Sequence, residues 1–355
     1  VLSILVLVHE LGHFIVAKKF GIKVEEFGLG LPLLPKIISI KHGETLYSIY
    51  PVLFGGFVRL YGEEAIVEKD RDRAFSSKSR FIRAGVITAG VFMNLLLAVV
   101  VFSVLYSILG VPRKGDTVRI IGTTETSPLK NKIKGEAKIL SVDGEIISSG
   151  DELKNLVDKK RGREIVLKIQ DPRGDTRELK VVPRESPPGG EGPLGIAFDD
   201  SEQYFAPLWQ RPFLGARYGI QEAFGWGVIV FDSILTLFKT LFTTASLPKD
   251  LAGPVGIFQI TGSVAEQGPL ALARLLGILS INLAILNIIP FPALDGGRLL
   301  FVALEAILGK RARTLLPMIE QKVNRIGFAL LMVFLIAITI QDLKRLEVIK
   351  RVLGQ

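Results

Sequence analysis

The stretch VLVHELGHFIVAKK, residues 6–19, carries two histidines and a glutamate inside an apolar segment. His9 and His13 are four residues apart, so on a helix they share one face and can bind one metal ion, while Glu10 between them can act on a metal-bound water. A charged side chain at the centre of a membrane helix costs about 2.5 to 3.5 kcal/mol, and two of the chain's three histidines fall in this motif. A purely structural role explains neither fact. The motif therefore predicts a Zn²⁺ site with Glu10 as the general base.

A third ligand must come from elsewhere, because a catalytic zinc site usually has three protein ligands and one open position. The chain has no cysteine, which excludes thiolate ligands, disulfides and cysteine nucleophiles. Asp295 is the only acidic residue between Pro269 and Leu304, so we expect it to complete the site. The alternative is a helix-capping aspartate at the membrane surface. His42, the remaining histidine, lies in a His-Gly turn and is predicted to be solvated rather than bound to metal.

Three runs without Asp, Glu, Lys, Arg or His indicate an integral membrane protein. Residues 85–109 and 275–294 are long enough to cross about 30 Å of hydrocarbon, and residues 326–341 can do so with their flanks. The opening segment, residues 1–20, is a fourth candidate span. A cleaved signal peptide is the competing interpretation, but it needs a basic n-region and a small-residue cleavage site, and neither is visible. We expect a multi-pass α-helical membrane protein with about four transmembrane helices.

The span within residues 272–308 is interrupted beside Asp295. Pro290 and Pro292 lack a backbone N–H donor, and a Gly-Gly pair follows the aspartate directly. Broken backbone at membrane depth is tolerated only where protein or a water-filled cavity satisfies the freed polar groups. The interruption therefore predicts a functional site rather than a plain span.

Two further regions depart from the apolar pattern. In residues 36–60, a β-rich run, a His-Gly turn and a second β-rich run are followed by Gly55-Gly56 and a third run, which predicts a small hairpin or sheet associated with the membrane surface. Residues 112–203 alternate short strand-like runs with Gly, Pro and Asp turns around one helical stretch, DELKNLVDKK. This pattern predicts a small soluble α+β domain, in which the segment ESPPGGEGP at 185–193 is a flexible loop.

Residues 212–247 are helical and apolar but carry one polar stripe at i, i+4, i+7, i+8 and i+11, formed by Asp232, Thr236, Lys239, Thr240 and Thr243. Such a stripe favours a helix in the membrane interface over a span. The chain is therefore expected to contain an N-terminal membrane part at 1–111, the soluble domain at 112–203, an interfacial region at 204–271 and a C-terminal membrane part at 272–355.

The net charge of +9 lies outside the soluble domain, since residues 112–202 contain 17 basic and 17 acidic residues. The excess flanks the apolar runs, where basic residues set topology and contact lipid head groups, and it gives no indication of nucleic-acid binding. Basic loops place residues 21–83 and 309–325 on the cytoplasmic face, so the soluble domain is expected outside the cytoplasm. Water must reach a site inside the membrane, so we also expect a cavity open to one aqueous side.

Five short motifs follow one another along nearly the whole chain: HELGH at 9–13, GGFV at 55–58, AGVFMNLLLA at 89–98, GPVGI at 253–257 and LNIIPFPALDGGRL at 286–299. In this order and spacing they resemble the site-2 protease family of intramembrane zinc metalloproteases, and most of all its bacterial regulator-of-sigma-E protease branch. The resemblance implies that His9, His13 and Asp295 bind zinc and that Glu10 is the general base.

The resemblance also implies a set of residues near the substrate, namely Asn287, Pro290, Pro292, Gly55, Gly56, Phe57 and Asn94. The first three match the motif beside the aspartate, whose asparagine helps to hold the substrate strand. The next three match a membrane-reentrant β-loop, whose edge can pair with an unwound substrate segment by strand addition. The last matches the asparagine of the second span, a packing or transition-state contact. The family motif usually has Gly-Pro before that asparagine, where this chain has Gly90-Val91.

Residues 112–203 resemble a PDZ domain of the kind that this branch carries outside the cytoplasm, through the pattern SPLKNKIKGEAKILSVDGEII at 127–147. The usual Gly-Asp turn of that pattern reads Gly135-Glu136 here. We therefore expect this single domain to act as a size filter or substrate gate rather than as a receptor for peptide carboxyl termini.

The implied activity is cleavage of single-span membrane proteins within or near their transmembrane segments, for example anti-sigma factors or remnant signal peptides. The implied location is the bacterial inner membrane, with the lipid bilayer and transmembrane substrates as partners and the active site nearer the cytoplasmic side. Serine and aspartyl intramembrane proteases are excluded, because the chain lacks their membrane histidine beside a serine and their paired membrane aspartates. A catalytically inactive scaffold and a zinc transporter are the remaining alternatives, and the retained Glu10 favours an enzyme. The sequence specifies neither the natural substrate nor the oligomeric state.

Overall fold

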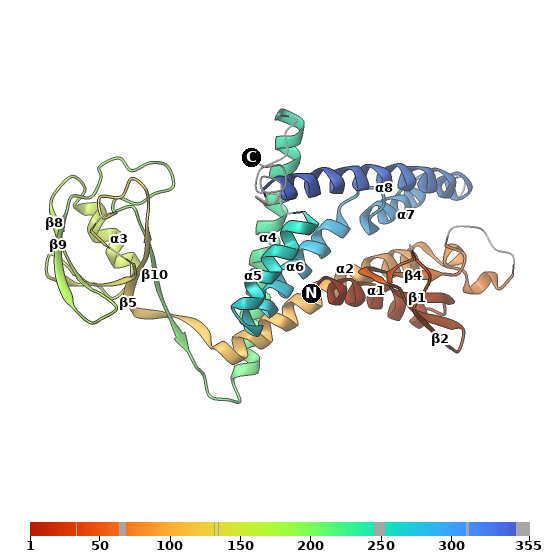
Figure 1. The fold of residues 1–355 in the computed structure, drawn as a ribbon, viewed down its shortest axis with the longest axis horizontal. Helices are drawn as coiled ribbons and strands as arrows, with labels where there is room; N and C mark the ends of the chain where they lie inside the picture. Colours follow the sequence, from red (N-terminus) through yellow and green to blue (C-terminus); the bar gives the residue numbers. More distant parts are fainter. Residues whose placement is uncertain are drawn as a thin grey trace, which may run out of the picture. The chain divides into compact units, whose positions relative to one another are not determined.

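The structure is a computed structural model that describes residues 1–32, 34–63, 69–130, 132–133, 135–244, 253–309 and 312–345. The chain forms two compact units, one made of Val1–Ile108 with Pro212–Gln355 and one made of Leu109–Arg211 (Figure 1). The first unit consists of helices and a small sheet, and the second consists of a larger sheet with one helix. Each unit has its own core of buried apolar side chains.

The helices of the first unit within the described residues are α1 Leu2–Lys19, α2 Arg80–Leu109, α4 Arg211–Thr244, α5 Pro254–Glu266, α6 Pro269–Ile288, α7 Asp295–Leu308 and α8 Ala312–Arg345. Two short 3₁₀ turns, Arg71–Arg73 and Phe75–Ser77, precede α2.

Four of the described helices are long and apolar enough to cross a membrane: α2, α6, the Arg211–Leu241 part of α4 and the Met318–Lys344 part of α8. They support the predicted multi-pass membrane protein, although the set contains α4 in place of α1. The 18 residues of α1 include three charged side chains, Glu10, Lys18 and Lys19, which lower its hydropathy. That α1 spans the membrane, and that residues 212–247 lie in the interface, both stay predictions.

The apolar segment at residues 272–308 is broken where the sequence predicts it. Helix α6 ends at Ile288 and α7 begins at Asp295, with both prolines in the segment between them. Within this segment Ala293 has a φ of 73°, in the left-handed region that residues with a Cβ rarely adopt. A Cβ at Gly296 would lie 2.5 Å from the carbonyl carbon of Ile288, so glycine is needed for the broken segment to fold back onto the first turn of α7.

The small sheet contains four strands in the order β2-β3-β1-β4, with bounds β1 Val24–Leu31, β2 Ile38–His42, β3 Thr45–Ile49 and β4 Val52–Leu60. Strands β2 and β3 form an antiparallel hairpin whose turn contains Gly43 at a φ of 61°. Strand β1 pairs with β3 in parallel and with β4 antiparallel. The predicted hairpin at the His-Gly turn is therefore confirmed, and it belongs to a sheet.

Two features of this sheet differ from the prediction. Gly55 and Gly56 lie inside β4 and do not separate two runs. Strand β1 is absent from the prediction because Glu25-Glu26 and Gly28 interrupt its apolar pattern. A Cβ at Gly28 would lie 2.6 Å from Phe57 Cζ, so this glycine in β1 makes room for an aromatic ring of β4.

The second unit contains a six-stranded sheet in the order β10-β5-β6-β8-β9, with β7 paired to β6. Its elements are β5 Val111–Thr123, β6 Ala137–Val142, β7 Glu145–Ile146, α3 Gly150–Lys159, β8 Ile165–Gln170, β9 Thr176–Val181 and β10 Ile196–Tyr204. Ser149 caps α3 by accepting from the N–H of Glu152. The alternation of buried and exposed residues along β6 and β8 closes the core against α3, as the β-rich pattern of the sequence predicts.

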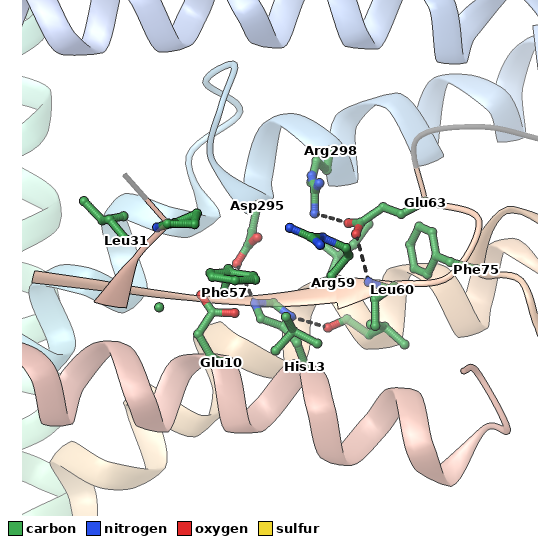
Figure 2. Close-up of a pocket in the computed structure, with 15 residues that line it drawn as sticks. Glu10, His13, Leu31, Phe57, Arg59, Leu60, Glu63, Phe75, Asp295 and Arg298 are labelled. Atoms are coloured by element: carbon green, nitrogen blue, oxygen red, sulfur yellow. Dashed lines mark hydrogen bonds and ion pairs between the residues drawn. The ribbon is translucent and has the colours of Figure 1, made fainter. Parts of the chain in front are cut away.

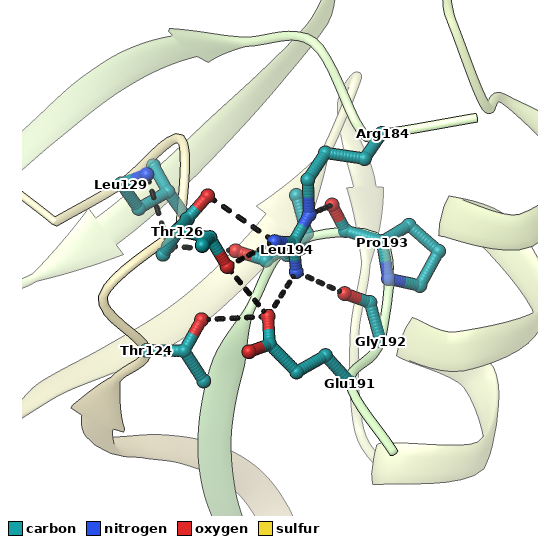
Figure 3. Close-up of polar contacts among 9 residues, drawn as sticks. Thr124, Thr126, Leu129, Arg184, Glu191, Gly192, Pro193 and Leu194 are labelled. Carbon is teal, nitrogen blue, oxygen red and sulfur yellow. Dashed lines mark hydrogen bonds and ion pairs between the residues drawn. The ribbon is translucent and has the colours of Figure 1, made fainter. Parts of the chain in front are cut away.

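Arg184 ties two loops of the second unit together. Its guanidinium donates to Thr126 Oγ1 at 2.6 Å and to the Gly192 carbonyl at 2.8 Å, and it forms an ion pair with Glu191 at 2.7 Å (Figure 3). Glu191 also accepts from the Thr124 hydroxyl at 2.9 Å. Arg184, together with the threonine hydroxyls, holds the pKa of the Glu191 carboxyl below its usual range. The loop predicted to be flexible is therefore fastened near its end by a polar cluster.

In the first unit, α2 and α4 pack through small residues. Gly215 and Gly219, four apart on α4, face Ser103 and Ser107, four apart on α2. A Cβ at Gly219 would lie 2.5 Å from the backbone nitrogen of Ser103, and a Cβ at Gly215 would lie 3.0 Å from that of Ser107. Small residues at this spacing let two membrane helices approach closely.

A carboxylate on α4 joins the same helices to α6. Glu222 accepts hydrogen bonds from Tyr106 Oη of α2 at 3.0 Å, from Trp226 Nε1 of its own helix at 3.1 Å and from Arg274 Nη2 of α6 at 2.8 Å. These three donors satisfy a charge that would be costly to leave unpaired beside apolar helices. The first half of α4 is therefore fixed against α2 and α6.

We expect Gly219→Leu to lower the thermal stability of the detergent-solubilised protein, by about 1 to 3 kcal/mol, because the new side chain would force α4 away from α2. The matched control is Gly225→Leu on the same helix, since a Cβ at Gly225 meets nothing within 4 Å. The measurement is the unfolding temperature of both variants beside the parent. Equal unfolding temperatures for the two variants would contradict this packing.

Candidate metal centre

Helix α1 and the first residue of α7 bring the three predicted ligands together. His9 Nε2 lies 3.1 Å from His13 Nε2 and 2.9 Å from Asp295 Oδ2, and His13 Nε2 lies 3.3 Å from the same oxygen. One ligand atom from each residue lies within 4.8 Å of the others. The two histidines point the same way because they are one helical turn apart. The third group, Asp295, comes from the first residue of α7, directly after the break between α6 and α7.

Each imidazole is oriented by a group of α2 behind it. His13 Nδ1 lies 2.8 Å from the Val86 carbonyl, which can only accept, so this nitrogen carries the proton and Nε2 presents its lone pair to the cluster. His9 Nδ1 lies 3.3 Å from the amide of Asn94, which is fully buried. The two amide atoms of an asparagine exchange by a half-turn of the side chain. Asn94 Oδ1, which has no other hydrogen-bond partner among the described residues, can then accept from His9 Nδ1–H.

Gly90 of α2 leaves the space that the two imidazoles of α1 occupy. A Cβ at this position would lie 2.6 Å from Cε1 and 2.7 Å from Nε2 of His9, and it would also collide with His13. On the facing side, a Cβ at Gly12 of α1 would lie 2.7 Å from the carbonyl carbon of Ala89. Helices α1 and α2 therefore pack backbone to backbone beside the cluster, and glycine is required on both.

The cluster fits Zn²⁺. Two imidazole nitrogens and one carboxylate oxygen are ligands of the type found in catalytic zinc sites with three protein ligands. Asp295 Oδ2 is buried and makes no hydrogen bond to any described residue, although it lies within 3.3 Å of both imidazole Nε2 atoms. Three atoms that converge with their lone pairs facing inward need a cation among them, because buried polar atoms left without a partner are costly.

Glu10 lines a cavity of about 370 Å³ beside this cluster. Figure 2 shows Glu10 and His13 projecting from α1, with Asp295 and Arg298 approaching from the opposite side on α7 and the strand β4 running between them. Phe57 of β4 completes this part of the wall. The cavity therefore brings the Glu10 carboxylate and two of the candidate ligands, His13 and Asp295, to one surface.

The glycine pair of β4 has two different surroundings. A Cβ at Gly56 would lie 3.2 Å from Glu10 Cγ, so glycine lets this strand lie directly over the catalytic candidate on α1. Gly56 and Phe57 both line the cavity. Gly55 faces Leu31 instead, where a Cβ would lie 2.8 Å from Leu31 Cγ, and it is outside the lining.

Asn94 also lies outside the cavity lining, behind His9. Its own carbonyl accepts from the Ser280 hydroxyl of α6 at 2.8 Å, in a fully buried contact. The structure therefore places Asn94 between a ligand and α6, which suits a packing and orienting role.

The three remaining predicted residues surround the break before α7. Asn287 is in the last turn of α6, and Pro290 and Pro292 follow it, all outside the cavity lining. Pro292 packs against α8, where a Cβ at Gly327 would lie 2.9 Å from the Pro292 carbonyl. That these residues hold substrate stays a prediction.

Arg298 and Glu63 are functional candidates that the sequence prediction lacks. Arg298 lines the cavity three residues after Asp295, and its guanidinium pairs with Glu63 at 2.6 Å, just beyond β4. The pair ties the helix that carries Asp295 to the sheet that covers Glu10. Arg298 could have been found from the sequence, because a residue three positions after Asp295 on a helix lies on the same face. Nothing in the sequence connects it to Glu63, which is far from it along the chain.

The chain is similar to known zinc metalloproteases over most of its length. The model of a family described as Peptidase family M50 matches residues 1–334. A protein of Clostridium perfringens, named provisionally as a zinc metalloprotease, is 35% identical over 345 residues, which cover 96% of each chain.

Two relatives carry the name zinc metalloprotease RasP. The protein of Geobacillus kaustophilus is 29% identical over an alignment of 427 positions, which covers 97% of this chain and 96% of the relative. The protein of Oceanobacillus iheyensis is 30% identical over an alignment of 427 positions, which covers 97% of both chains. The similarity thus extends over the helices, the small sheet and the second unit alike.

We expect Gly90→Ala to weaken zinc binding about 10- to 100-fold, because the added methyl group would displace both imidazoles. The matched control is Gly85→Ala on the same helix, where a Cβ meets nothing within 4 Å. The measurement is the zinc content of the purified proteins, followed by titration with a competing chelator. Wild-type zinc affinity in Gly90→Ala would show that this contact does not shape the site.

Proposed function

The chain belongs to peptidase family M50, the site-2 type of zinc metalloprotease, and from this premise we propose that it cleaves peptide bonds within or near the membrane-spanning segments of other proteins. The observation that carries the proposal is the place where the three candidate ligands converge. Helix α1 packs its two histidines against α2, and Asp295 follows the break after α6. Because α2 and α6 are both long and apolar enough to span a membrane, the chemistry is built among membrane helices.

We assign metal binding to His9, His13 and Asp295 and general base catalysis to Glu10. Bound zinc supplies a Lewis acid that polarises the scissile carbonyl and makes water a nucleophile near neutral pH. Glu10 stands on the cavity wall, where it can take the proton of the attacking water and pass it to the leaving amine. The Val86 carbonyl and the Asn94 amide on α2 keep both imidazoles in the tautomer that metal binding needs.

The substrate segment is proposed to bind as an added strand along β4. This strand is at one end of the sheet order, so its outer edge has no partner within the sheet as described. Gly56 and Phe57 of β4 already line the cavity beside Glu10. An extended peptide paired to this edge would therefore pass the candidate base, once its helix has unwound. At the opposite edge, Ile38 and Ile40 of β2 are 54% and 66% exposed, which suits contact with lipid.

The proposed location is the inner membrane of a bacterium, with the cavity nearer the cytoplasm. Helix α1 ends at Lys18 and Lys19, and the basic excess of the chain lies in segments that flank the candidate spans. Basic residues concentrate on the cytoplasmic side of membrane proteins. The second unit, inserted between α2 and α4, would then lie outside the cytoplasm.

We further propose that the second unit is a PDZ-like domain that limits the size of substrates. Strand β10 is an edge strand where a peptide could add, but side chains of the same unit cover part of it. Asp200 of β10 accepts from the Gly150 N–H of α3 at 2.9 Å, and Lys154 Nζ of α3 lies 5.6 Å from the ring centroid of Phe198 on β10. These contacts bring α3 onto the edge strand and favour a filter over a peptide receptor.

The filter can be tested with substrates that share one membrane segment but carry extracytoplasmic domains of increasing size. We expect the cleavage rate to fall as that domain grows, with the same membrane segment and no extracytoplasmic domain as the control. Rates that do not depend on size, or that rise when free peptides are added, would refute the filter and favour a peptide receptor.

Catalysis itself separates the enzyme from a catalytically inactive scaffold or a zinc transporter. We expect Glu10→Gln to reduce cleavage of single-span substrates by at least about 100-fold, because it removes the proton acceptor, while zinc stays bound. The measurement is cleavage by purified protein in detergent together with its zinc content. Glu25→Gln, on β1 and outside the cavity lining, is the matched control.

Asp295→Ala tests the ligand set independently. We expect it to lose zinc as well as activity. Full zinc occupancy with unchanged activity would remove Asp295 from the set, and cleavage by Glu10→Gln at the parent's rate would show that the assigned mechanism is wrong.

A further inference from the structure

We propose that Asn324, on α8, is a positioning residue for Asp295 and thereby sets the affinity of the metal site. The inference rests on the proposed role of Asp295 as a zinc ligand. Asn324 itself does not line the cavity. It acts on the short segment between α6 and α7 that leads into the aspartate.

The contact is made at the most strained point of that segment. Asn324 Oδ1 accepts from the backbone N–H of Ala293 at 3.2 Å. Ala293 has a φ of 73°, a conformation that a residue with a Cβ keeps only where its surroundings enforce it. Because Asp295 follows two residues later and opens α7, the direction of its carboxylate depends on the backbone at Ala293. The hydrogen bond from α8 is one of the contacts that enforce this backbone.

A second residue of α8 presses on the same segment. Gly327 is three residues after Asn324, so both lie on one face of the helix. A Cβ at Gly327 would lie 2.9 Å from the carbonyl carbon and oxygen of Pro292 and would collide with its ring. The absence of a side chain at Gly327 therefore lets α8 approach close enough for Asn324 to reach Ala293.

The far end of α8 is anchored as well, on the GPVGI motif. Asp342 is buried and accepts from the Gly256 N–H at 2.8 Å in the first turn of α5. A Cβ at Gly253 would lie 2.8 Å from Asp342 Oδ2 and would also collide with Ile338. The GPVGI motif therefore has a structural role, which is to fasten α8 to the first turn of α5. Helix α8 is thus held near its C-terminal end by α5, and nearer its middle it contacts the segment that leads to Asp295.

The test compares Asn324→Ala with the parent as full-length protein in detergent. We expect zinc to bind about tenfold more weakly, measured by competition with a chelator, since outer contacts of metal ligands commonly contribute factors of 10 to 100. We also expect the visible absorption of the Co²⁺-substituted protein to change, because the ligand geometry changes. Asn282→Ala is the matched control, since Asn282 donates only to Ile278 of its own helix turn among the described contacts.

Gly327→Ala provides a second route to the same displacement if Asn324→Ala fails to fold. We expect it to weaken zinc binding in the same direction, with Gly262→Ala as its control because a Cβ there meets nothing within 4 Å. Unchanged zinc affinity and an unchanged Co²⁺ spectrum in both α8 variants would overturn the proposal. An equal loss of zinc in both control variants would overturn it too, since the effect would then not be specific to the contact.

Asp295→Ala is the reference variant, because it distinguishes a failure of the proposed ligand set from a failure of the positioning role of Asn324. If it loses zinc while the α8 variants keep it, only the positioning role of Asn324 fails. If Asp295→Ala keeps its zinc, the proposed ligand set fails, and the positioning role of Asn324 fails with it.

Discussion

Three atoms with lone pairs, two imidazole nitrogens and one carboxylate oxygen, lie within 3.3 Å of one another among apolar helices. Such a group is stable inside a protein only when a cation shares it, because unpaired polar atoms are costly in a medium of low polarity. This one requirement constrains the rest of the first unit. Helix α1 must hold its histidines one turn apart, and α2 must lie against them with a hydrogen-bonding group behind each ring. The chain must also break between α6 and α7, so that Asp295 opens α7 beside the histidines.

Glycine is the means by which these elements come close enough. Gly90 leaves room for both imidazoles on α2, Gly56 lets β4 lie over Glu10, and Gly296 accommodates the end of α6 on the first turn of α7. In lipid, apolar side chains gain little by leaving one apolar surface for another, so helices associate through close backbone packing and internal polar contacts. The same physics explains the Gly215 and Gly219 contacts on α4. The glycines of the motifs are therefore as necessary to the geometry as the ligands.

The sequence predicts the local parts of this site well and its long-range parts poorly. His9, Glu10 and His13 follow from helical spacing alone, and the break before Asp295 follows from its prolines, because both signals lie within one element. Asp295 could be inferred as the one carboxylate in an apolar stretch and from the resemblance of the motif that contains it, but not from its spacing to the histidines. Contacts that depend on tertiary packing leave no such pattern.

The residues that the prediction lacks illustrate this limit. Glu63 belongs to none of the motifs that the sequence offers, yet it meets Arg298 at the cavity. Strand β1 carries two adjacent glutamates and a glycine that hide its alternation, although β1 is central to the sheet. Asn94 is recognisable as a polar residue in a span, but only the fold shows that it lies behind His9. In each case the partner is distant in the chain, so spacing carries no information about it.

Two ion pairs hold α7 against the N-terminal part of the chain. Arg298, on the first turn of α7, pairs with Glu63, and Glu305, two to three turns further along α7, pairs with Arg83 of α2. The side chains of Arg83 and Glu305 are both 12% exposed, so separating them would leave buried charges unpaired at a cost of about 3 to 5 kcal/mol. Helix α7 is therefore fixed to the N-terminal part of the chain at two points beyond Asp295, by contacts that do not involve the ligand cluster. Small zinc domains fold only when the metal binds. Here the charge pairs and the close helix packing hold Asp295 beside the two histidines through contacts that need no metal.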